Sequence, residues 1–539
     1  MTPALHESDS RARGRRSARS SPGPLPLYLV VPGVVAAAVA LTPFVYLFVR
    51  AGQAAWQDVE RVLLRPRLLE LLGNTLLLAA VVTALCVVVG VSLAWLVVRS
   101  DLPGRRVLGT TSALPLAIPT YVAAYAWLSL APEISGFLGA ATVLTLSSFP
   151  YVFIPVAAAL HGADPAMEEA SRGLGAGPWA TFWRVTLRSM RPSIAAGSLL
   201  VVLYVLSDFG AVSLMRYETF TFAIFQSYQA AFDRTAAVVL ALVLAGVTLV
   251  IVWGEARTRG RARYARVGAG ATRQGRAHGL GRLRFPAACY ASGVAALALG
   301  IPATALAYWL VRGRSQMPPL SEISAAAASS VGLSLGGAAV TVALATPVGL
   351  LVARHGDRLL PRLLERATYV GHALPGIVVA LSLVFLSVRV FFGLYQTALL
   401  VILAYAVLFL PLAVGAVRSS AAQAPPALED VARSLGRGPF EVLRTITLPL
   451  VTPGIAAGAA LVFLTCMKEL PATLLLRPTG VDTLATELWT ETGVGAFAAA
   501  APYAALLVLL SAVPTYLVSR RTGGWLRAEE TSARADEAA

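Results

Sequence analysis

The sequence predicts an all-α integral membrane protein with about twelve transmembrane helices, arranged as two parallel six-helix repeats. Three observations lead to this prediction. The chain of 539 residues is 57% hydrophobic and only 13% charged, whereas soluble domains carry about 25% charged residues. Apolar stretches of membrane-spanning length recur along the chain. A short polar passage occurs twice, once in each half.

A transmembrane helix needs ~20 predominantly apolar residues, and about six such stretches are predicted in each half. In the first half they centre on residues 27–49, 72–98, 108–131, 136–160, 193–215 and 235–253. In the second half they centre on residues 286–311, 328–353, 368–391, 392–418, 454–476 and 498–519. An even number of spans returns the chain to its starting side, so the second half repeats with the orientation of the first.

The net charge of +16 is spread over alternate loops. This is the pattern of a membrane protein whose cytoplasmic loops are enriched in Lys and Arg. A nucleic-acid partner is not indicated, because such a partner needs the charge on one patch. Both termini are predicted to be cytoplasmic, with membrane lipid around the spans. Three arginines on the opposite side, Arg61, Arg65 and Arg67, are an exception to the pattern.

The predicted boundaries follow from these stretches. The chain is divided into a basic cytoplasmic arm (1–26), a first transmembrane repeat (27–253), a cytoplasmic linker (254–284), a second transmembrane repeat (285–519) and a cytoplasmic tail (520–539). The linker is rich in Arg and Gly and has no apolar period, which is typical of a flexible connection.

The duplicated passage has a constant separation of 261 residues. The first copy reads Glu168-Glu169-Ala170-Ser171-Arg172-Gly173-Leu174-Gly175. The second copy reads Glu429-Asp430-Val431-Ala432-Arg433-Ser434-Leu435-Gly436. The repeat extends further: Arg99 matches Arg354, and Asp208 matches Glu469. Two copies of one loop indicate two copies of whatever the loop contacts.

Both passages are predicted to be short helices with one apolar face. Asp164 and Pro165 suit the N-cap and first helical position of the first copy, as Pro425-Pro426 does in the second. Apolar or small residues recur at i, i+3, i+4 and i+7. These residues are Met167, Ala170, Ser171 and Leu174 in the first copy, and Leu428, Val431, Ala432 and Leu435 in the second. Gly175 and Gly436 suit the left-handed position that closes a helix, and a second helix is predicted to begin at Pro178 and at Pro439.

These residues resemble the EAA loop of permease subunits in binding-protein-dependent ABC importers. That motif runs Glu-Ala-Ala, three residues, Gly, nine residues, then Ile-x-Leu-Pro. The matching positions are Glu169-Ala170-Ser171, Gly175, Val185 and Leu187 in the first copy, and Asp430-Val431-Ala432, Gly436, Ile446 and Leu448-Pro449 in the second. Arg188 replaces the Pro of the first copy. The resemblance places EAA loops at 164–192 and 425–453.

A second segment is more specific. Residues 468–478, which begin Lys468-Glu469-Leu470-Pro471, and residues 483–489 resemble the fused permeases of ferric-iron importers. Relatives that carry thiamine or aminophosphonates are similar. The resemblance therefore implies a type I ABC importer permease fold in the bacterial cytoplasmic membrane and import of ferric iron, with thiamine, an aminophosphonate or another small solute as alternatives.

The resemblance also implies partners and site residues. Homodimeric ABC ATPase subunits would bind ATP and Mg, and an extracytoplasmic solute-binding protein would deliver the solute. The residues expected to couple to the ATPase are Glu168, Glu169, Ala170, Gly175, Glu429, Asp430, Ala432 and Gly436. The chain has no Gly-x-x-x-x-Gly-Lys-Ser/Thr phosphate loop. No catalytic residue, resident metal or cofactor is predicted for it.

Three charged residues fall within predicted spans: Asp208, Lys468 and Glu469. A carboxylate at mid-bilayer costs ~2.5–3.5 kcal/mol on insertion scales. One hypothesis is that these residues flank a pathway or gate between the halves, and the alternative is an interfacial position or a structural pairing. The sequence leaves a secondary transporter of the major-facilitator kind as an alternative class. A membrane-embedded enzyme is disfavoured, because no clustered His, Asp or Ser set is found.

Overall fold

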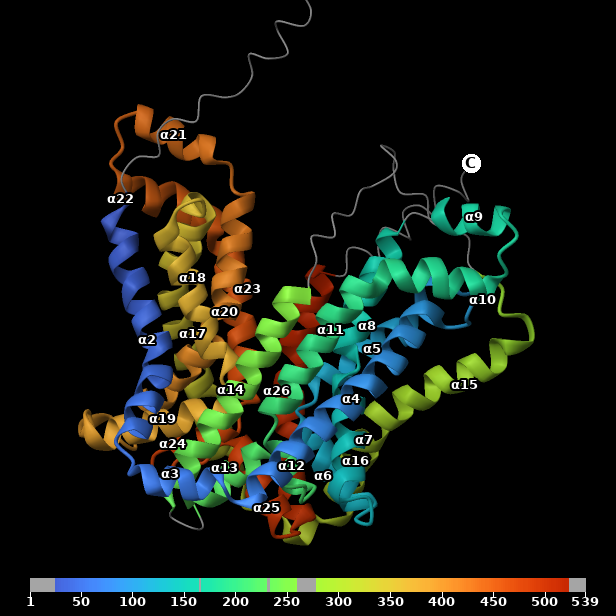
Figure 1. Cartoon of the computed structure of the whole chain (residues 1–539), viewed down its shortest axis with the longest axis horizontal. Coiled ribbons are helices and arrows are strands. Elements are labelled where there is room, and N and C mark those ends of the chain that lie inside the picture. The colour runs from blue at the N-terminus through green and yellow to red at the C-terminus, as the bar shows by residue number, and fades with distance from the viewer. Residues whose placement is uncertain (1–24, 164–165, 230–232, 259–277, 523–539) are drawn as a thin grey trace, which may run out of the picture.

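The computed structural model describes residues 25–163, 166–229, 233–258 and 278–522, and these residues are almost entirely helical (Figure 1). The all-α prediction is confirmed for this part of the chain. Its one β-type pairing is an isolated bridge between Ser100 and His278. The predicted arm and tail lie largely outside the described residues, as does the middle of the predicted linker.

The first half runs from α2 to α14. Its helices are α2 (Leu27–Gly52), α3 (Trp56–Leu63), α4 (Pro66–Arg99), α5 (Arg105–Ala113), η1 (Leu114–Ala117), α6 (Thr120–Leu130), α7 (Gly136–Ser148), α8 (Pro150–Gly162), α9 (Ala166–Gly173), α10 (Pro178–Thr181), η2 (Phe182–Thr186), α11 (Leu187–Ser207), α12 (Gly210–Leu214), α13 (Phe220–Gln229) and α14 (Arg234–Thr258).

The second half repeats this order. Its helices are η3 (Gly281–Leu283), α15 (Arg284–Ala295), η4 (Ala296–Gly300), α16 (Ile301–Arg312), η5 (Arg314–Gln316), α17 (Leu320–His355), α18 (Leu359–Ala373), α19 (Gly376–Arg389), η6 (Phe392–Leu394), α20 (Ala398–Gln423), α21 (Pro426–Ser434), α22 (Pro439–Val442), η7 (Leu443–Thr447), α23 (Leu448–Met467), α24 (Pro471–Leu476), α25 (Leu484–Gly493) and α26 (Phe497–Thr522).

Nine helical segments of the described residues are long and apolar enough to cross a membrane, and up to eleven if each of two bent pairs is one span. The bent pairs join residues 105–117 to 120–130 and 359–371 to 376–389, each with a bend of 97°. Residues Phe497–Ser511 of α26 form a shorter apolar helix. These segments account for the twelve predicted stretches.

Two predicted spans have wrong boundaries. The stretches at 193–215 and 454–476 were expected to be continuous, but the helices end at Ser207 and Met467 and short helices α12 and α24 follow. The spans instead begin earlier, so that residues 179–207 and 439–467 form long apolar segments. Hydropathy averaged over a span does not register the breaks, because the charged residues at them, Asp208 and Lys468-Glu469, are followed by further apolar residues.

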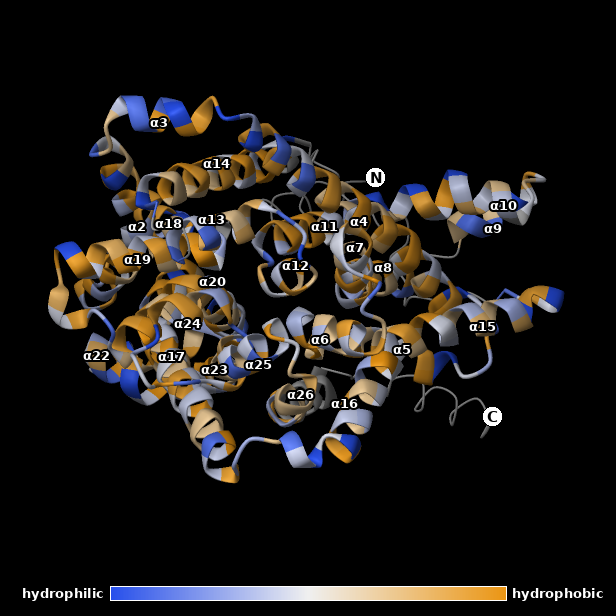
Figure 2. Cartoon of the chain, turned by 90° about the horizontal axis from the view of Figure 1, so that it is seen from below, coloured by the Kyte–Doolittle hydropathy of each residue, from blue (hydrophilic) through white to orange (hydrophobic). Residues whose placement is uncertain are grey.

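The first helix of each half packs against the other half. Helix α2 lies along α17 and α18, while α15 and α16 lie against α5 and α6 (Figure 1). Seen from below, α6, α12 and α25 lie near the middle of the molecule, and α12 and α6 of the first half both contact α25 of the second (Figure 2). The two halves are therefore intertwined as well as fused.

Small residues allow the closest helix pairs. Helices α17 and α20 approach closely at two glycines of α17, since a Cβ added to Gly337 would lie 2.8 Å from Tyr405 and one added to Gly349 would lie 2.7 Å from Val417. Such packing is typical of membrane helices, whose association depends on close van der Waals contact and not on burial from water. Large apolar side chains such as Leu77 and Val88 of α4 are exposed on the outside. This outward apolar surface suits a lipid environment.

Candidate functional site

The duplicated passages form helices α9 and α21, which lie at the same end of the molecule in opposite halves (Figure 1). Helix α21 begins at Pro426 with Pro425 as its N-cap, as predicted. Asp164 and Pro165 lie outside the described residues, so their predicted capping role is not described. Helices α10 and α22 begin at Pro178 and Pro439, as predicted.

The two helices end in the same way. Gly175 and Gly436 both have φ of +84°. In the first copy the N–H of Gly175 donates to Arg172 at 2.9 Å, and the N–H of Ala176 donates to Ser171 at 3.1 Å. In the second copy Gly436 and Arg437 make the same two bonds, at 3.0 and 3.1 Å. This is the Schellman closure, in which glycine avoids the strain of a left-handed residue.

Each helix presents apolar side chains to solvent. Leu174 is 89% exposed and Leu435 is 74% exposed. Met167 in α9, and Leu428 and Val431 in α21, are also exposed. An amphipathic helix with a bare apolar face is a ligand for a groove on a partner protein.

The acidic pair of each passage is divided between two environments. Glu168 and Glu429 are buried, while Glu169 and Asp430 are exposed. The sequence predicted one role for both members of each pair. The structure separates them, because adjacent residues of a helix point in directions about 100° apart. Of the predicted small residues, Ala170 is exposed and Ala432 is buried.

Glu168 is held by the end of α4 and by the helix that follows α9. Thr186 donates its hydroxyl to Glu168 Oε1 at 2.9 Å. Arg99 Nη2 lies 3.8 Å from the same oxygen and donates to the Ala163 carbonyl at 3.3 Å. Arg99 Nε is buried without a hydrogen-bond partner among the described residues. The carboxylate therefore relies on a hydroxyl and on a loose ion pair.

Glu429 is held more tightly. Arg354 at the end of α17 donates to Glu429 Oε1 from Nε at 3.1 Å and from Nη2 at 2.8 Å. The same guanidinium donates to the Ala424 carbonyl at 3.2 Å. Arg433 donates to Glu429 Oε2 at 3.2 Å and to Asp430 at 2.8 Å. The sequence revealed that Arg99 and Arg354 are equivalent, but it did not show what they contact.

A π-turn follows each short helix at the same place. Residues Phe182–Thr186 (η2) and Leu443–Thr447 (η7) adopt this rare geometry. Single π-turns inside α-helices are frequent at functional sites. These turns could not be predicted from the sequence, because they do not change the apolar pattern.

The described residues at the C-terminal end of the predicted linker contact the first copy and the end of α4. The His278 N–H donates to the Arg99 carbonyl at 2.8 Å, and Leu280 donates its N–H to Asp101 Oδ1 at 2.9 Å. The His278 ring lies against Arg172 of α9 through Nε2. Burial, followed by the charge of Arg172, lowers the pKa of His278. A neutral ring can accept a hydrogen bond from the guanidinium.

The three intramembrane charges lie where helices break. Asp208 Oδ1 accepts N–H bonds from Ala211 at 3.0 Å and Val212 at 3.3 Å in the first turn of α12, and Oδ2 accepts the Thr120 hydroxyl at 2.6 Å. Glu469 binds the first turn of α24 through the N–H groups of Ala472 and Thr473, both at 3.0 Å.

Lys468 bonds to the opposite half, where its Nζ donates to the Leu116 carbonyl at 3.0 Å.

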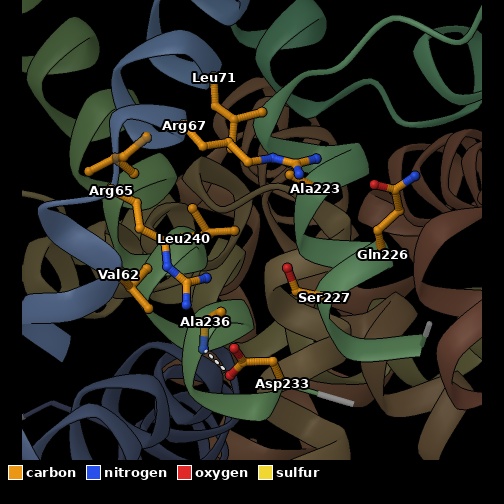
Figure 3. Close-up of a pocket in the computed structure, with 11 residues that line it drawn as sticks. Val62, Arg65, Arg67, Leu71, Ala223, Gln226, Ser227, Asp233, Ala236 and Leu240 are labelled. Atoms are coloured by element: carbon orange, nitrogen blue, oxygen red, sulfur yellow. Dashed lines mark hydrogen bonds between the residues drawn. The ribbon is translucent and has the colours of Figure 1, made fainter. Parts of the chain in front are cut away.

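A cavity of about 390 Å³ lies at the other end of the molecule from α9 and α21 (Figures 1 and 3). Its lining includes Arg65, Arg67, Leu71, Gln226, Asp233 and Leu240. Arg67 is paired with Glu218 at 3.1 Å. No group of three or more His, Cys, Asp and Glu side chains that could hold a metal ion occurs in the described part of the chain.

Comparison with protein families gives a match in each half. The family of binding-protein-dependent transport system inner membrane components matches residues 72–259 and 345–523. These two segments contain α9 and α21, respectively, and the residues that hold them.

Individual relatives agree with this match. The Fe(3+)-transport system permease protein FbpB 2 of Haemophilus influenzae is 39% identical over 484 residues, which cover 89% of this chain and 95% of the relative. The sulfate transport system permease protein CysT of Escherichia coli is 30% identical over 237 residues, 40% of this chain and 85% of the relative. A probable sulfate permease of Chlorokybus atmophyticus is 28% identical over 235 residues, again 40% of this chain and 82% of the relative.

Proposed function

This chain belongs to the family of binding-protein-dependent transport system inner membrane components, and from that premise we propose that it is the permease of an ATP-driven importer for ferric iron. The family is one of transport permeases, which decides against the major-facilitator alternative. The similarity to the Haemophilus permease supports the choice of iron, because it extends over both halves. The sulfate permeases match only 40% of the chain.

The observation that carries the coupling role is the duplicated pair of exposed helices. Helices α9 and α21 have the same closure, lie at one end and expose an apolar face with a carboxylate, Glu169 or Asp430. Two equivalent ligands suit two equivalent grooves, as a homodimeric ATPase would offer. ATP and Mg would bind on those separate subunits.

The buried acids have a different part in this proposal. Glu168 and Glu429 tie each coupling helix to the end of a long membrane helix through Arg99 and Arg354. A force on α9 or α21 would therefore reach α4 or α17 directly. These acids position the helix, while Glu169 and Asp430 face the ATPase.

The orientation of the chain in the membrane follows from the position of its Arg-rich loops. The end that carries α9 and α21 would be cytoplasmic, with both termini on that side, because the Arg-rich loops gather there. A solute-binding protein would dock at the opposite end. Closure of the ATPase pair on ATP would draw the coupling helices together and rock the halves apart on the far side.

Substitution of the closing glycines tests the coupling role. A Cβ at Gly175 or Gly436 would have no atom within 4 Å, so Gly175→Trp and Gly436→Trp leave the membrane core intact. Each places a non-glycine residue in left-handed geometry, which costs roughly 1–2 kcal/mol, and adds a bulky group at the docking end. We expect the double variant to reach the membrane but to lose ATP-dependent uptake and co-purification of the ATPase.

The matched control is Gly480→Trp, which also meets open space and has φ of +81°, but lies in the loop before α25 at the other end of the molecule (Figure 1). This variant should retain ATP-dependent uptake and co-purification of the ATPase. Unchanged uptake by the double glycine variant would remove the coupling assignment.

The solute is tested separately, by binding assays on the partner solute-binding protein with ferric ion, thiamine and an aminophosphonate. Tight binding of thiamine or the phosphonate, without iron, would replace the proposed substrate.

A further inference from the structure

Two helix breaks, one from each half, meet at the interface between the halves. In the first half the bent pair turns by 97° between η1 and α6, next to Leu116. In the second half α23 ends at Met467, and α24 begins at Pro471. Carbonyls at such breaks lie outside the helical hydrogen-bond ladder and need other donors.

Two reciprocal hydrogen bonds join these breaks. Lys468 Nζ donates to the Leu116 carbonyl at 3.0 Å. The Tyr121 hydroxyl donates to the Lys468 carbonyl at 3.3 Å. Each bond therefore pairs a side chain of one half with a main-chain carbonyl of the other. We call these three residues, Leu116, Tyr121 and Lys468, the latch.

The Lys468 ammonium has its hydrogen-bond acceptor in the opposite half. It is the one lysine in the sequence. Among the described residues it has no carboxylate partner within an ion-pair distance. Its neighbour Glu469 is engaged by the first turn of α24 and by the Thr473 hydroxyl. When the halves separate here, the ammonium loses its protein acceptor, and a bare ammonium gains most from being paired.

Packing within the first half fixes Tyr121. A Cβ added to Gly210 would lie 2.8 Å from Tyr121 Cβ, so α12 packs directly against the tyrosine. Helix α12 is in turn held by Asp208 through the N–H groups of Ala211 and Val212. Asp208 thus anchors the short helix that packs against Tyr121, and Glu469 anchors the short helix that follows Lys468.

The pseudo-equivalent positions of the repeat do not carry the two donors of the latch. Ser207 stands where the second half has Lys468, 261 residues away, and its hydroxyl bonds to Leu203 of its own helix. Ile377 stands where the first half has Tyr121, and it has no side-chain donor. Among the described residues, the two reciprocal bonds of the latch therefore have no counterpart at the equivalent positions of the repeat.

We propose that the latch holds the two halves closed at this crossing in the resting transporter and breaks in every transport cycle. Lys468 is a positioning residue, because it acts through the contact between halves and not on the solute. The inference rests on the proposed function, since it needs an ATP-driven cycle. It adds a contact between the halves that the repeat does not duplicate, because Ser207 and Ile377 stand at the positions equivalent to Lys468 and Tyr121.

Because Lys468 is the one lysine, acetylation with a small membrane-permeant anhydride reports on the latch directly. We would label the complete complex in lipid nanodiscs, at rest and trapped with ATP, vanadate and binding protein, and quantify the Lys468 peptide by mass spectrometry. Loss of a hydrogen bond to a charged group predicts about a 10-fold rise in labelling in the trapped state. Equal labelling in the two states would overturn the latch.

Variants give a second measurement that does not need the solute. Lys468→Met removes the donor at similar length, and we expect ATP hydrolysis without binding protein to rise about 10-fold, as one charged hydrogen bond is lost. Tyr121→Phe removes the weaker bond and should raise hydrolysis less. Lys468→Arg should lie near the wild type, and Ser207→Ala is the matched control at the equivalent position of the first half.

The outcomes separate the two claims. A wild-type complex that retains no ATPase overturns the proposed function and the latch together. An intact complex in which Lys468→Met and Tyr121→Phe hydrolyse ATP at the wild-type rate overturns the latch alone. If Lys468→Met fails to assemble, Tyr121→Phe decides the matter, since that variant removes a hydroxyl without creating a large cavity.

Discussion

Helices α9 and α21 have the same backbone but different ionic contacts. Their closing glycines share φ of +84°, and the π-turns that follow lie at equivalent positions. Yet Glu168 receives a threonine hydroxyl and a 3.8 Å contact from Arg99, whereas Glu429 receives two bonds from Arg354. The two copies therefore agree more closely in the backbone of the docking helix than in the side-chain contacts that hold it.

The chain connection accounts for part of this difference. The end of the linker lies against α9, where His278 contacts Arg172. The equivalent Arg433 instead bonds to Glu429 and Asp430 of its own helix. Since a fused chain has one linker, a contact of this kind can form in one half only. The comparison shows that pseudo-symmetry ends where connectivity differs.

The largest predicted contrast concerns the two arginines. Arg354→Ala leaves Glu429 buried with one partly exposed partner, and loss of one member of a buried pair costs about 3 kcal/mol. Arg99→Ala leaves the Thr186 hydroxyl bonded to Glu168, so we expect the free energy of unfolding to fall by about 1 kcal/mol. Unfolding of the purified variants in detergent measures the difference. Equal losses would show that the two acids are held equally.

A second contrast concerns the equivalent threonines. Thr186→Val removes a hydrogen bond to a carboxylate, which is worth about 1.5 kcal/mol or more. Thr447, within the described chain, is buried without a bond to Glu429, so Thr447→Val should change the stability little. The same detergent unfolding assay compares them. A larger loss of stability for Thr447→Val than for Thr186→Val would contradict the hydrogen bonds described for Glu168 and Glu429.

The smallest effect is expected at His278. His278→Ala frees Arg172 to pair with its own helix, as Arg433 does, so the loss should stay below about 1 kcal/mol. A double-mutant cycle with Arg172→Ala measures the coupling. The control pair is His278→Ala with Arg433→Ala, which lie in different halves and should be additive. A coupling energy between His278 and Arg433, with none between His278 and Arg172, would contradict the contact of His278 with the first docking helix.

Much of the coupling site could be predicted because its signals are local. Gly175 and Gly436 mark helix ends, and Pro178 and Pro439 mark helix starts, through backbone rules that need no partner. The division of each acidic pair could not be predicted. It depends on Arg99 and Arg354, which lie 69 and 75 residues away in the sequence from the acids they contact.

The spans show the same limit. Helix lengths follow from hydropathy, but the breaks at Ser207 and Met467 depend on Asp208 and Glu469 binding the next helix turn. The exchange of α2 and α15 between halves is a long-range packing arrangement, which local periodicity does not specify. The contacts of His278 likewise arise from a linker whose composition is typical of an unstructured connection.

The most direct test of the account is cross-linking from both docking helices. In a variant without Cys86, Cys289 and Cys466, Leu174→Cys and Leu435→Cys would each place a thiol on an exposed position. With a short cross-linker in cells that express the whole transport system, we predict that both positions capture the same ATPase subunit with similar yields. Capture of no ATPase from either position would contradict the account.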